Sequence, residues 1–282
     1  MGEAFNAVDG VRISFQESGA GPTIVLVHGS GLSRAVWRGL GYTKALEEHF
    51  HVVTLDLRGH GRSDKPQHED AYSMDLLVGD ILEVLDAAGV QAAHYLGYSA
   101  GARIGFSLLA SSPGRVKTFT SAGGTYRSPA GQIQSIFFPG YDQALDRGGV
   151  PEFLRQWSDA TGREIDPQTA TAFLANDPVA LRAYFRRSED EPGIPEADLR
   201  KMETPTLLLA GTEDPLRHED SERAAQLMPR AQFHALNGRN HGQTLIPAGP
   251  LLTIFNSFIS SRLDQHGNPA PSNSQGPSPS TL

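Results

Sequence analysis

The segment from Gly97 to Gly101 constrains the fold more than any other, because it reads Gly-Tyr-Ser-Ala-Gly and matches the pattern G-x-S-x-G. An apolar run, 93–96, precedes it, and a stretch of helical character, 102–109, follows it. Glycines two residues to either side of Ser99 remove the Cβ atoms that would block the close approach of a helix to a strand. The segment therefore predicts a strand, a sharp turn and a helix in immediate succession.

Composition supports a folded domain with a sizeable core. The 282 residues are 39% hydrophobic and 20% charged, which suits one large α/β domain or two small ones. A net charge of −8 and the lack of any Lys/Arg cluster argue against nucleic acid as a partner. The chain has no cysteine, and no His, Asp and Glu set shows metal-ligand spacing. We therefore expect no disulfide, no metal and no cofactor.

The two ends of the chain carry no sign of a membrane or secretion signal. The first residues lack a basic segment followed by an apolar stretch, and no apolar run reaches membrane-spanning length. These features predict a soluble, cytoplasmic protein without a membrane partner. Residues 265–282 are nearly all Pro, Ser, Asn and Gly, so a disordered tail is expected there.

Short β-branched runs alternate with longer amphipathic stretches, a pattern typical of an α/β fold with a mainly parallel central sheet flanked by helices. The expected strands are 23–27, 52–57, 94–96, 116–121, 206–210 and 232–236. The expected helices are 34–49, 73–88, 100–111, 220–228 and 250–263. Asp9-Gly10, between two short apolar runs, predicts an antiparallel hairpin with a type I′ turn at one edge of the sheet.

Strand character disappears between Gly123 and Glu203, and we interpret this segment as a helical insertion between two strands. Its aromatic residues could line a substrate pocket or form the core of the insertion itself, and the sequence leaves both open. The large apolar residues there are Phe137, Phe138, Phe153, Leu154, Trp157, Phe173, Leu174, Tyr184 and Phe185.

Four further motifs follow expected strands, at the ends where open parallel sheets bind their ligands. They are the segments 28–31, 56–63, 211–215 and 237–242. A serine hydroxyl acts as a nucleophile only when a base and oxyanion donors lie beside it. The small residues of the first motif make the backbone N–H groups of Ser30 and Ala100 the candidate oxyanion hole.

The sequence resembles the α/β-hydrolase fold superfamily over roughly residues 5–263, because five motifs agree in order and spacing. The resemblance implies Ser99 as nucleophile, His241 as general base and then acid, and Asp214 as the group that orients the imidazole. It also implies a core of residues 1–124 and 204–264, with a helical cap, 125–203, inserted after the sixth strand and lying over the active site. For the 56–63 loop it implies a mainly structural role.

Several assignments around this site have rivals. Glu213 competes with Asp214 as the acid, although Pro215 fixes the turn beside Asp214. His28 and His60 lie in loops near the site, where donors that hold loop backbone together are common. The candidate substrate-binding residues are His28, Gly29, Tyr98, Phe137 and Trp157.

Three arginines near these motifs could bind an acidic substrate, but ion pairs that anchor loops are the commoner explanation. They are Arg58, Arg62 and Arg103.

The resemblance implies a serine hydrolase that cleaves an ester, thioester, lactone or related acyl bond of a small, partly hydrophobic molecule through an acyl-enzyme. Serine at position 99 disfavours epoxide opening and halide removal, for which relatives use an aspartate there. Carbon–carbon bond hydrolysis and hydroxynitrile cleavage keep the serine triad and stay open, as does a small-molecule receptor on this fold. The natural substrate and the oligomeric state are not readable from the sequence.

Overall fold

A computed structural model of the protein describes residues 1–263. Its strands form one eight-stranded sheet in the order β1-β2-β4-β3-β5-β6-β7-β8. The pairs β1–β2 and β2–β4 are antiparallel, and all other neighbouring strands are parallel. The strands are β1 (Gly2–Phe5), β2 (Arg12–Ser18), β3 (Thr23–Val27), β4 (His51–Leu55), β5 (Ala93–Tyr98), β6 (Val116–Ala122), β7 (Thr206–Gly211) and β8 (Ala231–Leu236).

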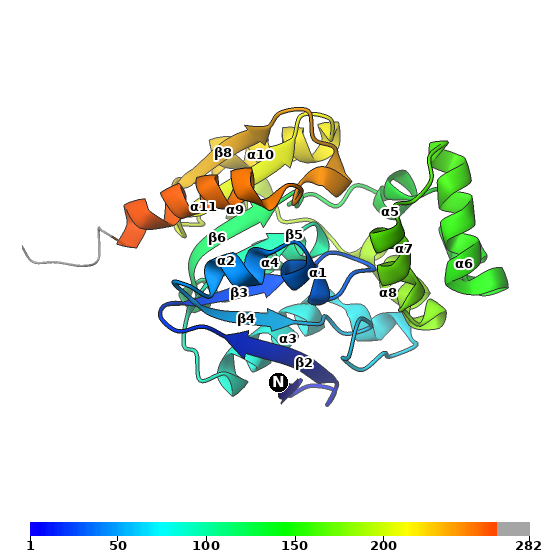
Figure 1. Ribbon diagram of the computed structural model, residues 1–282, viewed down its shortest axis with the longest axis horizontal. Coiled ribbons are helices and arrows are strands. Elements are labelled where there is room, and N and C mark those ends of the chain that lie inside the picture. The colour runs from blue at the N-terminus through cyan, green and yellow to red at the C-terminus, as the bar shows by residue number, and fades with distance from the viewer. Residues whose placement is uncertain (264–282) are drawn as a thin grey trace, which may run out of the picture.

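Helices cover both faces of this sheet (Figure 1). The apolar residues of α1 (Ala35–Gly39), α2 (Tyr42–Leu46) and α11 (Ala248–Leu263) share one buried cluster. Those of α3 (Met74–Ala87), α4 (Ala100–Ser111) and α10 (Pro215–Leu227) belong to another. The short 3-10 helices are η1 (Glu69–Tyr72), η2 (Pro113–Arg115) and η3 (His241–Gln243).

Strand β3 explains why the central strands are apolar throughout. Successive side chains of a strand point to opposite faces of the sheet. Ile24 and Leu26 pack in the cluster that contains α11, whereas Val25 and Val27 pack in the cluster that contains α3 and α4. Since helices cover both faces, no position of the strand can be polar without cost, and the predicted fold class is confirmed.

The predicted strands of the parallel part lie within two residues of the observed ones, but the hairpin prediction was wrong in its turn. β1 ends at Phe5 and β2 begins at Arg12, so six residues connect them. A type I′ turn needs positive φ at both central residues, and Ser99 is the only non-glycine residue with positive φ in the described part of the chain. Within the loop the Gly10 N–H donates to the Asn6 carbonyl, at 2.8 Å, and the buried Asn6 amide donates to Asp80, at 2.8 Å.

Two helix predictions also need correction. The stretch 34–49 forms two short helices, because Gly41 between them takes a left-handed conformation with φ of 85°. Helix α10 begins five residues before the predicted start, at Pro215, whose ring fixes φ in the helical range and whose missing N–H is not needed in the first turn. The predicted tail, 265–282, lies outside the described residues.

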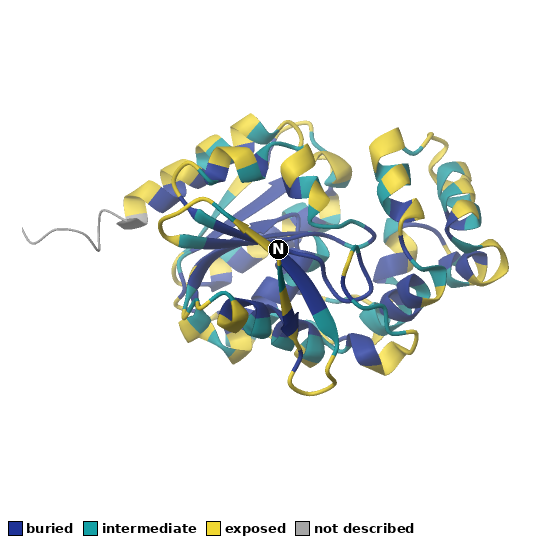
Figure 2. Cartoon of the chain, turned by 60° about the horizontal axis from the view of Figure 1, so that its bottom comes forward, coloured by how far each residue is buried: buried dark blue, intermediate teal, exposed yellow. Residues whose placement is uncertain are grey.

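The segment between β6 and β7, residues 123–205, is called the insertion below. It contains α5 (Gln132–Ile136), α6 (Tyr141–Thr161), α7 (Pro167–Leu174), α8 (Pro178–Asp190) and α9 (Glu196–Leu199), and no strand. Helices α5 to α8 stand at the end of the sheet where the parallel strands finish (Figure 1). Their inward faces are buried and their outward faces exposed (Figure 2). None of the described helices combines the length and the apolar character needed to cross a bilayer.

Candidate active site

The turn between β5 and α4 holds Ser99 in a conformation that most residues avoid, with φ of 53° and ψ of −116°. Its N–H donates to the Ala122 carbonyl, at 2.9 Å, which ties the turn to β6. A Cβ at Gly97 would lie 2.5 Å from the backbone of Gly101, and one at Gly101 would collide with the carbonyl oxygen of Val27. The two glycines therefore allow the helix to start directly against the strands.

Two hydrogen bonds connect Ser99 to residues far away in the sequence. The hydroxyl Oγ of Ser99 lies 2.9 Å from Nε2 of His241. Nδ1 of His241 lies 3.0 Å from Oδ2 of Asp214, whose side chain is 6% exposed. The carboxylate accepts the proton on Nδ1, so Nε2 is free to accept the serine proton. The structure thus brings together the three residues that the sequence proposed as a triad.

Contacts between the loops after β7 and β8 explain this alignment. The N–H of Glu213 donates to the Arg239 carbonyl, at 3.0 Å, and the N–H of Gly238 donates to Thr212 Oγ1, at 2.9 Å. A Cβ at Gly211 would collide with the same Arg239 carbonyl. A capping box between Asn240 and Gln243 then starts η3 at His241. The aspartate and histidine loops are therefore built as one unit.

Tyr98 contacts His241 through both its ring and its hydroxyl. Its ring stacks on the imidazole of His241, with centroids 5.4 Å apart and planes inclined by 19°. Its hydroxyl donates to the backbone carbonyl of His241, at 3.1 Å. Tyr98 was proposed as a substrate-binding residue, and the contacts observed here are those of a residue that holds His241 in place.

Arg217 is a further neighbour of the triad that sequence analysis did not single out. Its guanidinium donates to Oδ1 of Asp214, at 3.0 Å, and its side chain is 9% exposed. Burial and the positive charge of Arg217 lower the pKa of His241 to about 4, although Asp214 opposes this. Burial alone would raise the pKa of Asp214, but the bonds and charges of His241 and Arg217 lower it. The resting pair is therefore a neutral imidazole and a carboxylate.

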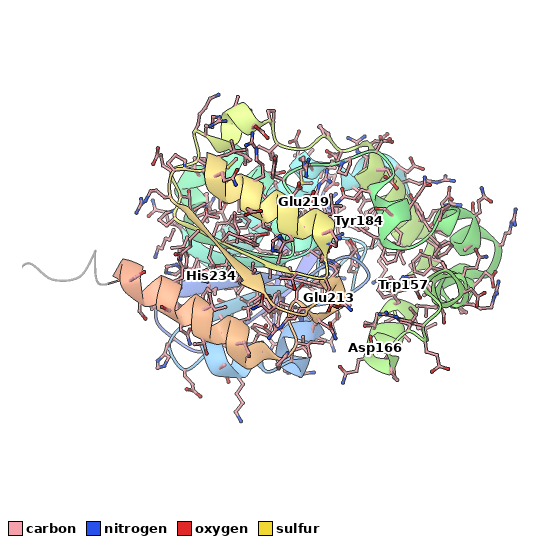
Figure 3. The ribbon with its side chains drawn as sticks, turned by 90° about the horizontal axis from the view of Figure 1, so that it is seen from above. Trp157, Asp166, Tyr184, Glu213, Glu219 and His234 are labelled. Carbon is pink, nitrogen blue, oxygen red and sulfur yellow. The ribbon has the colours of Figure 1, made fainter. Side chains whose placement is uncertain are left out.

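The rival acid, Glu213, is exposed to solvent and makes no side-chain hydrogen bond within the described part of the chain. Figure 3 shows it at the same loop, before α10. Asp214 is the carboxylate that contacts the imidazole.

The loop after β3 lies directly against Ser99. A Cβ on Gly29 would be only 3.0 Å from the Cβ of Ser99 and from the ring of Tyr98, so this position needs the smallest residue. The backbone N–H groups of Ser30 and Ala100 donate to no protein acceptor in the region described. Both donors are thus available to a substrate oxygen.

His28 and His60 hold this loop together through hydrogen bonds to its backbone. Both rings are fully buried. Nδ1 of His28 donates to the Gly29 carbonyl, at 2.8 Å, while Nε2 accepts the Leu57 N–H, at 3.0 Å. His60 bridges the Arg58 carbonyl and the Gly31 N–H in the same way. Burial lowers the pKa of His28, and lowers that of His60 to about 3. The proposed substrate contact of His28 is therefore replaced by a structural role.

The insertion contacts the same loop through α8 and through the connection between α7 and α8. The Tyr184 hydroxyl of α8 lies 3.1 Å from Ser30 Oγ, and the Asn176 amide donates to the Gly31 carbonyl, at 2.9 Å. Figure 3 shows Tyr184 nearer to the sheet than Trp157. The insertion is therefore attached directly to the backbone that carries one of the candidate oxyanion donors.

Phe137 and Trp157, proposed to bind substrate, lie in the aromatic core of the insertion. Their ring centroids are 4.9 Å apart, and both contact Phe153, which is fully buried. The cavity next to Ser99, of about 30 Å³, is lined by other residues, most of which the sequence did not point to. They are Ala100, Arg103, Gly123, Thr125, Gln132, Ile136 and Arg217.

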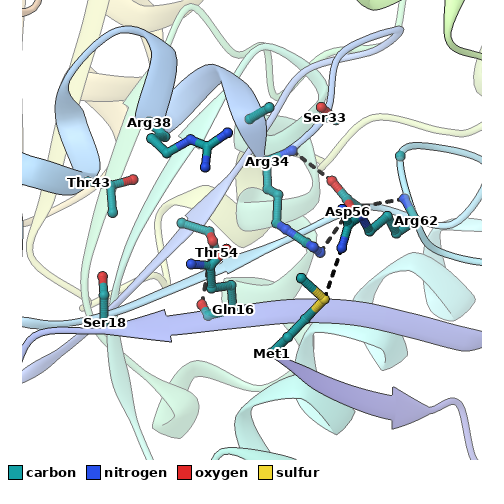
Figure 4. A pocket seen from close by; sticks show the side chains of 12 residues that line it. Met1, Gln16, Ser18, Ser33, Arg34, Arg38, Thr43, Thr54, Asp56 and Arg62 are labelled. Carbon is teal, nitrogen blue, oxygen red and sulfur yellow. Dashed lines mark hydrogen bonds and ion pairs between the residues drawn. The ribbon is translucent and has the colours of Figure 1, made fainter.

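A larger hollow, of about 220 Å³, lies elsewhere and shares no lining residue with this cavity. Figure 4 shows Asp56 at its wall, bonded to Arg34 and to the N–H of Arg62. A Cβ on Gly61 would collide with the same carboxylate. The 56–63 loop is therefore tied together around Asp56, which is buried.

Comparison with known proteins agrees with this architecture. A family model described as the alpha/beta hydrolase fold matches residues 22–164, just over half of the chain. The serine turn, the strand order and this match define the class: the chain belongs to the α/β-hydrolase fold family.

Among its relatives, the chain is 29% identical over 250 residues to the pimeloyl-(acyl-carrier protein) methyl ester esterase of Methylococcus capsulatus, and 88% of each chain is covered. It is 28% identical over 263 residues to epoxide hydrolase 3 of Mus musculus, with 82% of this chain and 69% of that protein covered. The crystal structure of the enol-lactonase from Burkholderia xenovorans LB400 matches with a TM-score of 0.77 at 20% identity, covering 92% of this chain and 100% of that one. At that identity the last likeness concerns the fold alone.

Proposed function

We propose that this protein is a serine hydrolase that cleaves an ester, thioester, lactone or related acyl bond through an acyl-enzyme. The observation that carries the proposal is the continuous chain of hydrogen bonds from Ser99 through His241 to Asp214. Relatives named as hydrolases support hydrolysis in general, and the one named as an esterase supports cleavage of an ester.

The proposed reaction uses each of these groups in turn. Ser99 Oγ attacks the carbonyl carbon while its proton passes to Nε2 of His241. The carbonyl oxygen becomes negative and accepts hydrogen bonds from the N–H groups of Ser30 and Ala100. The imidazolium, stabilised by Asp214, gives the proton to the leaving oxygen or sulfur, and the acyl group stays on Ser99. Water then attacks with His241 as base, which releases the acid and restores the hydroxyl.

Serine at the turn favours acyl chemistry over epoxide opening, despite the relative named as an epoxide hydrolase. Attack of a hydroxyl on an sp³ carbon would leave an ether, which has no carbonyl for water to attack. Attack on an acyl carbon leaves an ester that the same histidine can hydrolyse. Residues of the insertion beside Ser99, in the segment proposed as a cap, would then shape the acyl pocket.

Ser99→Ala tests the proposal on an activated ester. We expect turnover of p-nitrophenyl acetate to fall by about 10⁴-fold or more, because the nucleophile is lost while the backbone turn accepts alanine. The wild type should react with a fluorophosphonate probe, and the variant should not. Circular dichroism provides the control for folding.

Turnover of the folded variant at the rate of the wild type would disprove the nucleophile assignment. If the wild type reacted with the probe but released product at most once, the protein would be a receptor or a single-turnover acceptor, and the hydrolase proposal would fail.

A further inference from the structure

The cavity beside Ser99 has two arginines in its wall and no carboxylate among its lining residues. The two arginines, Arg103 and Arg217, come from different helices, α4 and α10. Cations in the wall of a small cavity raise the question of which anions balance them. Arg58, an arginine buried elsewhere in the molecule, shows how a buried guanidinium is balanced by carboxylates.

Arg58 is completely paired. Its guanidinium contacts the carboxylates of Asp80, at 2.6 Å, and Asp9, at 2.7 Å. Burial alone would lower the pKa of Arg58, but these two acids raise it. Arg58 is thus an anchor for its loop, as ion pairs of this kind commonly are.

Arg103 is different, because it has no ion-pair partner among residues 1–261, whose side chains are described. It donates to the neutral oxygens of Ser128, Gln132 and the Glu191 backbone. The carboxylate of Glu191 is paired with Arg187, and Glu191 and Glu189 both act on Arg103 only at longer range. Burial lowers the pKa of Arg103. This cation therefore lies at the cavity without a counter-ion in contact.

Arg217 provides free donors at the same cavity. One N–H group of its guanidinium bonds to Asp214, and the others have no acceptor within the described part of the chain. The side chain is nevertheless 9% exposed, so these donors are not generally open to solvent. The one carboxylate in contact with it, Asp214, is shared with His241, and Asp220 acts on Arg217 only at longer range.

We infer that the acyl part of the substrate carries a carboxylate, which the cavity binds through the free N–H groups of Arg217 and the charge of Arg103. The inference rests on the proposed function and names its substrate class: half-esters or thioesters of short dicarboxylic acids. Guanidinium groups suit such a ligand, because their planar N–H groups match carboxylate geometry. The acyl part is the relevant one, because it is bonded to Ser99, which forms part of the cavity wall.

The test compares esters that differ only in this charge. The substrates are the mono-p-nitrophenyl esters of succinate, glutarate and adipate, each paired with its counterpart in which the second carboxylate is a methyl ester. We expect kcat/KM of the wild type to favour the anionic member of at least one pair by about ten- to a hundredfold, the range of a charge-assisted hydrogen bond. Equal rates in all three pairs would overturn the inference while the proposed function stands.

Arg217→Gln should abolish this preference. Because Arg217 also bonds to Asp214, its loss slows both members of a pair, and the informative quantity is the ratio of the two rates. Arg217→Lys should retain part of the ratio through its charge. Arg223→Gln is the matched control, since Arg223 lies on the same helix, is largely exposed and pairs with Glu196. A ratio that survives in Arg217→Gln would disprove the assignment.

A binding measurement separates this inference from the reaction itself. Monomethyl glutarate is titrated calorimetrically into Ser99→Ala, which binds without turnover, and into the double variant that also carries Arg217→Gln. We expect Ser99→Ala to bind monomethyl glutarate, and we expect the dissociation constant to rise by about tenfold or more in the double variant. No binding, or equal binding by both, would count against the carboxylate site even if no ester proved to be a substrate.

Discussion

The carboxyl ends of the parallel strands and the insertion above them are built by opposite means. At the strand ends, glycines remove side chains so that backbone meets backbone, as at Gly97, Gly101 and Gly211. In the insertion, large rings fill the interior, and Phe153 contacts the rings of Phe137, Trp157 and Phe173. One region is arranged by close backbone approach and the other by aromatic packing.

The difference teaches which parts of the site tolerate change. Backbone contacts of this kind leave no room for a larger residue, because an added Cβ meets backbone atoms of a neighbouring strand, helix or loop. Ring packing can be rearranged as long as volume is kept. The groups that meet within hydrogen-bond distance therefore lie at the strand ends, while part of the lining of the cavity beside Ser99 comes from the insertion.

The largest effect is expected at the strand ends. Asp214→Asn should lower kcat/KM for p-nitrophenyl acetate by about 10⁴-fold, because an amide at this place favours the wrong tautomer of His241. Glu213→Gln is the matched control, and it should leave the rate unchanged because this side chain is exposed. A larger loss in Glu213→Gln than in Asp214→Asn would mean that the acid is misassigned.

An intermediate effect is expected in the insertion. Phe153→Ala removes a fully buried ring and should lower the stability of the insertion by about 3–5 kcal/mol. The two tryptophans report the regions separately, since Trp37 lies in the cluster with α11 and Trp157 in the insertion. Phe153→Ala is combined with Trp37→Phe, which leaves Trp157 as the only tryptophan, and separately with Trp157→Phe, which leaves Trp37. In urea titrations followed by tryptophan fluorescence, the signal of Trp157 should change at a lower urea concentration than that of Trp37.

The control for that measurement is Phe119→Ala, which removes an equally buried ring from β6. This change should shift the transitions of both tryptophans, because the sheet supports both regions. If Phe153→Ala also shifted both by the same amount, the insertion and the sheet would unfold as one unit and the contrast between them would be lost.

The smallest effect concerns pH. Only neutral His241 can accept the serine proton, and burial together with Arg217 lowers its pKa to about 4. The active form is therefore present above that pH and is lost as pH falls through it. We expect kcat/KM to stay level in mildly acidic solution and to fall to half near pH 4, whereas an unperturbed histidine would give half activity near 6.5.

Arg217→Gln should move this midpoint to higher pH, because a positive charge that disfavours the imidazolium is removed. Arg223→Gln again serves as the control, with circular dichroism at each pH to exclude unfolding. A wild-type midpoint at or above 6.5 would contradict the role assigned to burial and to Arg217.

Local sequence patterns predicted the parallel strands, the serine turn and the order of the three triad candidates. Each of these depends on neighbours in the chain: apolar runs define buried strands, and Gly97 and Gly101 define the turn. The break at Gly41 and the six-residue hairpin loop were missed. Asn6 in the hairpin loop contacts Asp80, which lies 74 residues away, and no local pattern indicates that contact.

The lining of the cavity was the least predictable part of the site. Arg217 lies three residues after Asp214, but nothing in that spacing tells whether its guanidinium turns inward. The sequence does not distinguish Arg103 from Arg58, and only their surroundings differ. Arg58 has two carboxylates in contact, whereas Arg103 has none in the described part of the chain. Phe137 and Trp157 looked like pocket residues because apolar side chains suit a pocket and a core equally well.

The sequence by itself determined the α/β class, the strained turn at Ser99 and the presence of a serine, an aspartate and a histidine after three different strands. These follow from periodicity and from glycine positions, which act over a few residues. Only the tertiary structure decided that Asp214 and not Glu213 meets His241, that His28 is enclosed, and that Arg103 and Arg217 share a cavity. Such outcomes depend on which side chains face each other across loops that are distant in the chain, and that geometry is set by packing of the whole fold.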